Sequence, residues 1–218
     1  MAKIKPWPAA GLLSPAGSSS DDNDECCQSS QGAVEQKQQA AAAEYTVWMK
    51  SLVFNGNGCT VYGADGRVAY RVDNYGCRGG REVFFMDRAG SNLIRIQRKS
   101  FFMFRRWEAC RCFDDGEGEE ARPWFRVHKT WKQDDGCAAV VTMHGSGRTY
   151  RIEGCARKSD YRILSADDGA IMAAVGRKRT SAGVVLGEDV LALTVGSATD
   201  HLLALGLVVV CGLMSRRL

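Results

Sequence analysis

Several features that mark secreted, membrane-spanning or metal-binding proteins are missing from this sequence. The first twenty residues, MAKIKPWPAAGLLSPAGSSS, contain three prolines and never form the apolar core of a secretory signal. No Asn-x-Ser/Thr acceptor occurs in the 218 residues, and no Cys-x-x-Cys pair accompanies the nine cysteines and three histidines. We therefore expect reduced thiols in a cytoplasmic protein, with the plasma-membrane surface or the nucleus as alternatives, and neither a metal site nor a cofactor.

Recognisable catalytic motifs are missing as well. HGSG (His144–Gly147) has His where a nucleophile elbow requires Gly, so a hairpin turn explains it better. The glycine-containing stretches NGNGC and GCRGG lack the Lys-Ser/Thr of a phosphate-binding loop. Asp167 and Asp168 lack the alternating oxygen ligands of a calcium loop. We predict a protein that is not an enzyme and has no catalytic residue.

The N-terminal 43 residues contain few large apolar side chains. They are rich in Pro, Gly, Ser, Gln and Ala and include the acidic run DDNDE. Such a composition cannot offset the entropy of ordering, so we predict a disordered segment over 1–43 that regulates the protein or recruits a protein partner. The folded domain is then expected over 44–218.

From Tyr45 onward, short runs rich in Val, Ile, Tyr, Phe and Trp alternate with Gly and Asp. Asp65-Gly66, Asp87 to Gly90 and Asp168-Gly169 supply residues that tolerate the backbone of tight hairpins. Further strands are predicted at 101–112, 124–131, 137–143, 149–155 and 190–195. About a dozen antiparallel strands must close or split to protect their edges, and we predict a closed β-barrel.

The C-terminal run LLALGLVVVCGLM is the longest uncharged apolar stretch. Its 13 residues, from Leu202 to Met214, would cover about 20 Å as a helix, whereas crossing a bilayer takes about 20 residues. We favour a helix buried along the barrel axis over a membrane anchor, with Asp200 as its N-cap and Arg216 and Arg217 at its far end. The predicted core-helix residues are Leu202, Leu203, Leu205, Leu207, Val208, Val209, Val210 and Leu213.

Positive charge is concentrated in the middle of the chain. Between Ser91 and Thr180 there are 18 Lys and Arg against 12 Asp and Glu, although the whole chain carries only +4. If the barrel gathers these cations, they form a site for multivalent phosphate; otherwise they are solvated strand faces. Trp107, Trp124 and Trp131 could stack on bases, but we expect no specific nucleic-acid recognition. The candidate headgroup-binding residues are Arg95, Arg98, Lys99, Arg105, Arg106, Arg177, Lys178 and Arg179.

Several motifs in their order along the chain are similar to those of the LURP-one-related family of plant proteins. They are RKSFFMFRRWEACR, YRIEGCARKSDYRIL, DDGAIMAAVGRKR and LGEDVLALTVGSATDHLLALGLVVVCGLM, and the resemblance extends from about Tyr45 to Met214. It implies a tubby-like fold, a twelve-stranded barrel around a hydrophobic C-terminal helix. The acidic insertion Asp114 to Glu120 and the ending GLMSRRL depart from the family pattern.

The same resemblance implies distant kinship with phospholipid scramblases and with tubby-type proteins, which tether to phosphoinositides and are associated with transcription. A role in plant defence is also implied, but no catalytic residues can be transferred. We expect a peripheral protein that binds anionic phospholipid or phosphoinositide through its basic residues. Two alternatives stay open: a transcription-associated factor that binds protein or DNA without lipid, and a scramblase-like protein whose tail spans the membrane.

Overall fold

The computed structural model describes residues 42–50, 58–73, 82–101, 104–114, 119–130 and 137–215. The predicted disordered segment up to Ala41 lies outside these ranges, as do Trp131, Arg216, Arg217 and the middle of the acidic insertion. Arg105 belongs to a described strand, but its side chain is outside the description.

Alternating apolar residues produce strands along nearly the whole described chain. The predicted strands at 137–143, 149–155 and 190–195 have those bounds, whereas the strand predicted at 124–131 begins earlier, at Glu119. The strands are β1 (Ala43–Trp48), β2 (Gly58–Tyr62), β3 (Val68–Asp73), β4 (Glu82–Asp87), β5 (Asn92–Phe101), β6 (Phe104–Asp114), β7 (Glu119–Lys129), β8 (Cys137–Met143), β9 (Thr149–Cys155), β10 (Asp160–Ser165), β11 (Ile171–Arg177) and β12 (Val190–Val195).

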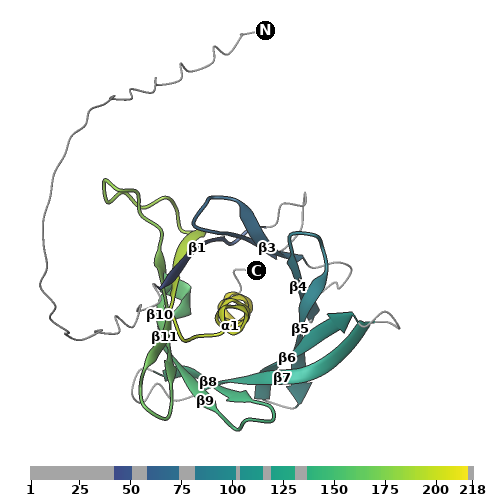
Figure 1. Ribbon diagram of the computed structural model, residues 1–218. Coiled ribbons are helices and arrows are strands. Elements are labelled where there is room, and N and C mark those ends of the chain that lie inside the picture. The colour runs from purple at the N-terminus through teal and green to yellow at the C-terminus, as the bar shows by residue number, and fades with distance from the viewer. Residues whose placement is uncertain are drawn as a thin grey trace, which may run out of the picture. The chain divides into compact units, whose positions relative to one another are not determined.

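These strands form one closed antiparallel barrel. Each strand pairs with its neighbours in sequence, and β1 pairs with β12 to complete the ring, from Ala43 opposite Val195 to Trp48 opposite Val190. Closure removes the unpaired edges that an open sheet of this size would expose. Figure 1 views this ring with a helix inside it. The predicted fold class, a closed antiparallel barrel with a C-terminal helix, is confirmed.

The helix α1 (His201–Met214) fills the barrel. Its side chains from Leu203 to Cys211 are at most 4% exposed and belong to the same core cluster as the inward residues of the strands. Leu202 and Leu213, at its two ends, are half-buried. Gly206 leaves room for the wall, because a Cβ there would lie 3.1 Å from Ile94 Cδ1 and 3.3 Å from Phe125 Cζ.

The helix begins as the sequence indicates, with Asp200 as N-cap. One Asp200 carboxylate oxygen accepts hydrogen bonds from the amides of Leu202 (2.9 Å) and Leu203 (3.2 Å). The ring of Tyr45 on β1 lies edge-on to His201, and its hydroxyl is 2.8 Å from His201 Nδ1. No helix in the described part of the chain has the length and apolarity needed to cross a membrane.

The antiparallel order gives the barrel two distinct ends. We call the end where α1 begins the proximal end; it carries the β2–β3, β4–β5, β8–β9 and β10–β11 turns. The opposite, distal end carries the short 3₁₀ helix η2 (Ala156–Lys158) between β9 and β10, and the connection between β11 and β12.

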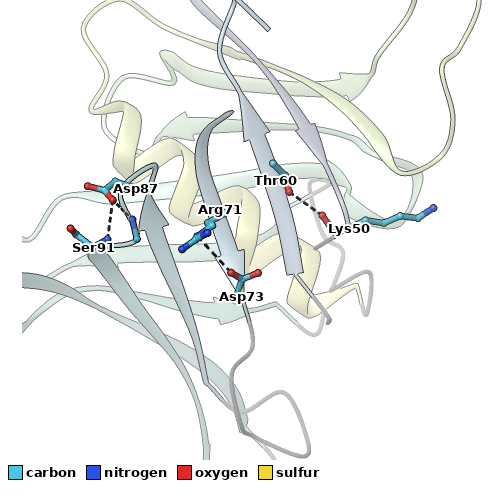
Figure 2. A network of polar contacts seen from close by, with 7 residues as sticks. Lys50, Thr60, Arg71, Asp73, Asp87 and Ser91 are labelled. Atoms are coloured by element: carbon cyan, nitrogen blue, oxygen red, sulfur yellow. Dashed lines mark hydrogen bonds and ion pairs between the residues drawn. The ribbon is translucent and has the colours of Figure 1, made fainter. Parts of the chain in front are cut away.

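The turns at the proximal end are tight and locally satisfied. In the β4–β5 turn, an Asp87 carboxylate oxygen accepts hydrogen bonds from the amides of Gly90 (2.8 Å) and Ser91 (2.9 Å), as Figure 2 shows. Gly90 has φ +96°, a conformation that favours glycine. The predicted Asp-Gly turns are thus present where the pattern places them.

Two buried polar residues of the wall, Thr60 on β2 and Asp73 on β3, lie close to other polar groups. The Thr60 hydroxyl donates to the Lys50 carbonyl (3.3 Å), and Arg71 Nε lies 3.7 Å from Asp73 Oδ2 (Figure 2). Asp73 is 4% exposed and Thr60 is fully buried. The Thr60 hydrogen bond therefore joins β2 to Lys50, just beyond the end of β1, whereas the Arg71–Asp73 ion pair lies within β3.

Candidate functional site

Strand alternation separates the cations of β5 and β6 from the core. Ile94 and Ile96 of β5 are fully buried. Because successive side chains of a strand alternate between its two faces, Arg95 and Lys99 face outward. Register pairs Lys99 with Arg106 and Arg95 with Cys110 on β6. Three of the predicted residues, Arg95, Lys99 and Arg106, therefore share the outer face of these two strands.

Strand β7 adds two residues that were not among the predicted ones. Its Arg126 pairs with Glu108 and its His128 with Arg106, which places both on the same outer face. The alternation of Arg126 and His128 with the buried Phe125 and Val127 was the available signal. We call this surface the β5–β7 basic face; it consists of Arg95, Lys99, Arg106, Arg126 and His128, with Glu82 and Glu108 among them.

The cations of the β5–β7 basic face outnumber its carboxylates. Glu108 Oε1 lies 3.1 Å from Arg126 Nε and 3.4 Å from Arg106 Nε, so two guanidinium groups share one carboxylate. Arg95 Nε lies 3.8 Å from Glu82, which also accepts a hydrogen bond from the Gln97 amide. With Lys99, four cations face two carboxylates, and the face keeps an excess of positive charge.

The electrostatics of His128 reflect this excess. Partial burial lowers the pKa of the His128 imidazole, and the neighbouring Arg126 and Arg106 lower it further, against a smaller opposing effect of Glu108. The ring is consequently neutral near pH 7, and an anion bound on the face would favour its protonation.

Two predicted residues of the same strands are placed differently. Arg98 pairs with the buried Trp107 and has the strand parity of Ile94 and Ile96, so it belongs to the inward side of β5 near the distal end. Arg105 pairs with Ser100 in the backbone register, but its side chain lies outside the description.

Arg177, Lys178 and Arg179 lie where β11 leaves the barrel at the distal end. They enter a hairpin, here called the β11–β12 hairpin, which spans Lys178 to Asp189. Arg177 Nη2 lies 3.8 Å from Glu188, and Arg179 Nη1 donates to the Gly183 carbonyl at 3.0 Å. Lys178 is half-buried and has no ion pair among the described residues.

The exposed cations of η2 lie beside this hairpin. Register pairs Tyr161 with Val175, so η2, which ends just before β10, is at the level of Arg177 and Lys178. Arg157 and Lys158 of η2 are exposed. We call Arg157, Lys158, Arg177, Lys178 and Arg179 the hairpin cluster.

The structure does not merge the two basic surfaces. Both include residues near the distal end, but five strand-to-strand steps separate β6 from β11 around the ring, which places them on opposite walls (Figure 1). Six of the predicted residues therefore lie on two separate surfaces: Arg95, Lys99 and Arg106 on one, and Arg177, Lys178 and Arg179 on the other. The sequence alone did not show that these two groups of cations lie on different walls.

The proximal end has a hollow of about 290 Å³ near the start of α1. Trp124, Arg148, Tyr150 and Asp200 are among its lining residues. The helix amides there are occupied by Asp200, and Arg111 lies 3.7 Å from Asp200 and over the ring of Trp124, 4.7 Å from its centre. The positive end of α1 is thus neutralised by the chain's own carboxylate.

Metal-ligating side chains do not gather in the described ranges. No cluster of three or more His, Cys, Asp or Glu that could hold a metal ion occurs within them. Burial raises the pKa of Cys59 and of Cys211 to about 12, so these thiols stay protonated and weakly nucleophilic. Trp107 is 6% exposed and belongs to the core.

Comparison with known proteins agrees with this architecture. A solved X-ray structure of an Arabidopsis thaliana protein has the same fold, with a TM-score of 0.54 at 15% identity, covering 79% of this chain and 90% of that one. LURP-one-related protein 11 of Arabidopsis thaliana is 36% identical over 184 residues, covering 78% of this chain and 77% of the relative. LURP-one-related protein 4 is 36% identical over 171 residues, with the same coverage.

The family model described as LURP-one-related matches residues 43–212, which spans the barrel from the first residue of β1 to the last turn of α1. Together with the relatives above 30% identity, this match establishes that the chain belongs to the LURP-one-related family.

Proposed function

We propose that this chain is a non-enzymatic, tubby-like binding module that attaches peripherally to anionic membrane surfaces, including phosphoinositide-containing ones. The observation that carries the proposal is the hairpin cluster, in which five cations gather on two neighbouring distal connections, with Glu188 3.8 Å from Arg177. Lys and Arg on projecting connections reach a flat surface more readily than the same residues on a barrel wall.

The β5–β7 basic face supplies a second contact on the opposite wall. Its carboxylates already engage Arg95, Arg106 and Arg126, so its attraction for an anionic surface is weaker per cation than that of the hairpin cluster. We assign it a supporting role, in which Lys99 and Arg106 near the distal end add to the local positive potential.

Flotation of the full chain with vesicles tests the proposal. Vesicles of phosphatidylcholine alone and with added phosphoinositide are compared at low and at physiological salt. Selective flotation that persists at physiological salt is expected, since several cations close to a charged surface are only partly screened there. A folded protein that floats with neither vesicle, but binds DNA in a salt-sensitive way, would instead favour the nucleic-acid alternative.

Charge variants at the two ends provide a matched control. The triple variant Arg177→Gln, Lys178→Gln and Arg179→Gln should lose most of its flotation at physiological salt. The control triple Arg67→Gln, Arg88→Gln and Arg148→Gln removes the same charge from exposed proximal positions and should float like the parent protein. Equal losses in both triples would show that net charge, rather than the hairpin cluster, drives attachment.

A further inference from the structure

The tip of the β11–β12 hairpin is an uncharged stretch on a projecting ribbon. Residues 180–187 read TSAGVVLG, and within them Val184 is 62% and Leu186 is 53% exposed. Only two other large apolar side chains of the described residues are exposed, Phe113 and Ile171. Phe113 lies under the Arg122 guanidinium and Ile171 lines a proximal hollow, so both have neighbours that account for them.

Backbone hydrogen bonds within the hairpin hold its two arms together. The Thr180 amide donates to the Val184 carbonyl (2.8 Å), the Leu186 amide to the Lys178 carbonyl (3.0 Å), and the Gly183 amide to the Thr180 carbonyl (2.9 Å). The Thr180 hydroxyl accepts from the Val184 amide at 3.2 Å, and Gly183 turns the chain at φ +82°. Paired backbone groups lower the cost of moving the tip out of water.

Cations and apolar residues lie side by side along the ribbon. Behind the uncharged tip, Arg179 pairs with Val185 and Lys178 lies opposite Leu186, and the carboxylates of Glu188 and Asp189 follow at the base. Asp189 is anchored there, because its Oδ2 lies 2.9 Å from Lys50 Nζ and accepts from Trp48 Nε1 at 3.1 Å. These contacts lower the pKa of Asp189 and tie the base to β1. Long Lys and Arg side chains can extend toward the headgroups of an anionic bilayer while apolar side chains at the same level of the ribbon enter the acyl chains.

We infer that the β11–β12 hairpin inserts shallowly into the interface of an anionic bilayer, with Val184 and Leu186 among the upper acyl chains and Lys178 and Arg179 at the level of the phosphates. This inference rests on the proposed function and adds to it the element that enters the membrane. The cations bring the hairpin to the surface, and the two apolar side chains make attachment resistant to salt, because hydrophobic burial is not screened.

Two sets of variants test the insertion on vesicles of phosphatidylcholine and phosphatidylserine. In the double variant Val184→Ser and Leu186→Ser, partition at physiological salt should fall roughly tenfold for each side chain, while low-salt flotation persists. Ile171→Ser, which removes a comparably exposed apolar side chain at the proximal end, should partition like the parent protein. Thermal melting of each variant verifies that the barrel is folded.

Fluorescence locates the tip directly. Val184→Trp, after subtraction of the parent spectrum, should show a blue shift on vesicles and quenching by lipids brominated near the headgroup, whereas Ile171→Trp should show neither. If the parent protein floats but the serine variant floats equally well and Val184→Trp does not respond, the inference is wrong and the proposed function stands. If the parent protein does not float at all, both are wrong. The inference would also be overturned if the parent protein forms a dimer in vesicle-free solution and the serine variant is monomeric. The tip would then be a contact between two copies of the chain.

Discussion

The β4–β5 turn and the start of α1 at the proximal end contrast with the β11–β12 hairpin at the distal end. At the proximal end the Asp87 carboxylate accepts hydrogen bonds from the amides of its own turn, and the Asp200 carboxylate accepts one from the Leu202 amide at the start of α1. Both carboxylates therefore stabilise the fold. At the distal end the hairpin carries Lys178 and two exposed apolar side chains, Val184 and Leu186, beyond the body of the barrel. Groups that a fold does not use for itself are the ones available for a partner.

This difference separates the residues that stabilise the barrel from those on which the proposed attachment depends. The helix and the turns that admit it determine whether the chain folds, and the distal connections contribute little buried area. Substitutions at the proximal end and in the core should therefore change stability, whereas substitutions at the distal end should change attachment alone.

The largest effect is expected from removing the helix altogether. Deletion of residues 200–218 withdraws side chains from Leu203 to Cys211 that are each almost fully buried. Each large one contributes about 1.5–3 kcal/mol, and their sum is comparable with the total stability of about 5–15 kcal/mol typical of a domain. We expect no cooperative melting transition by circular dichroism. A soluble truncated chain that melts cooperatively would contradict the central role of α1.

A smaller loss is expected from overfilling the space between helix and wall. Gly206→Leu adds four carbons where a single Cβ already lies 3.1 Å from Ile94 and 3.3 Å from Phe125. Such overpacking costs about 1–3 kcal/mol in the free energy of unfolding, measured by urea denaturation. Gly176→Leu is the matched control, since a Cβ at Gly176 meets no atom within 4 Å. Equal stability of the two variants would mean that the barrel expands without cost around α1.

Capping at the proximal end has a smaller effect again. Asp200→Ala removes both hydrogen bonds to the start of α1 and the nearby charge of the Arg111 pair. We expect a loss of about 1 kcal/mol by chemical denaturation, with flotation unchanged. The distal substitution Lys178→Gln should have the reverse profile, a stability within about 0.5 kcal/mol of the parent protein and weaker flotation. The contrast between the ends fails if Asp200→Ala also weakens flotation.

The smallest effect concerns pH. Because the pKa of His128 is lowered in the folded barrel, protonation favours the unfolded chain, and the contribution of the neutral ring to stability is present above about pH 6.5 and declines as the pH falls through the folded-state pKa. His128→Asn should flatten the stability curve slightly below that pH. Nuclear magnetic resonance titration of Arg126→Gln should show the His128 pKa moving upward, and an unchanged value would remove Arg126 as a cause.

Much of the fold was predictable because local patterns carry it. The uncharged run from Leu202 to Met214 is too short to span a bilayer and too apolar for a surface helix, which leaves the barrel interior. The candidate site was predictable only in part. Arg95, Lys99 and Arg106 were identified, but Arg126 and His128 were missed, because their place beside β6 depends on strand register rather than on neighbours in sequence.

The sequence by itself determined where the hairpins turn and that the final helix is buried, since each of these follows from periodicity or turn chemistry over a few residues. Only the tertiary structure decided which cations share a surface. Closure of twelve strands places β6 and β11 on opposite walls, and the distal connections bring η2 beside the β11–β12 hairpin. Proximity between residues distant in the chain depends on the geometry of ring closure, which no local pattern specifies.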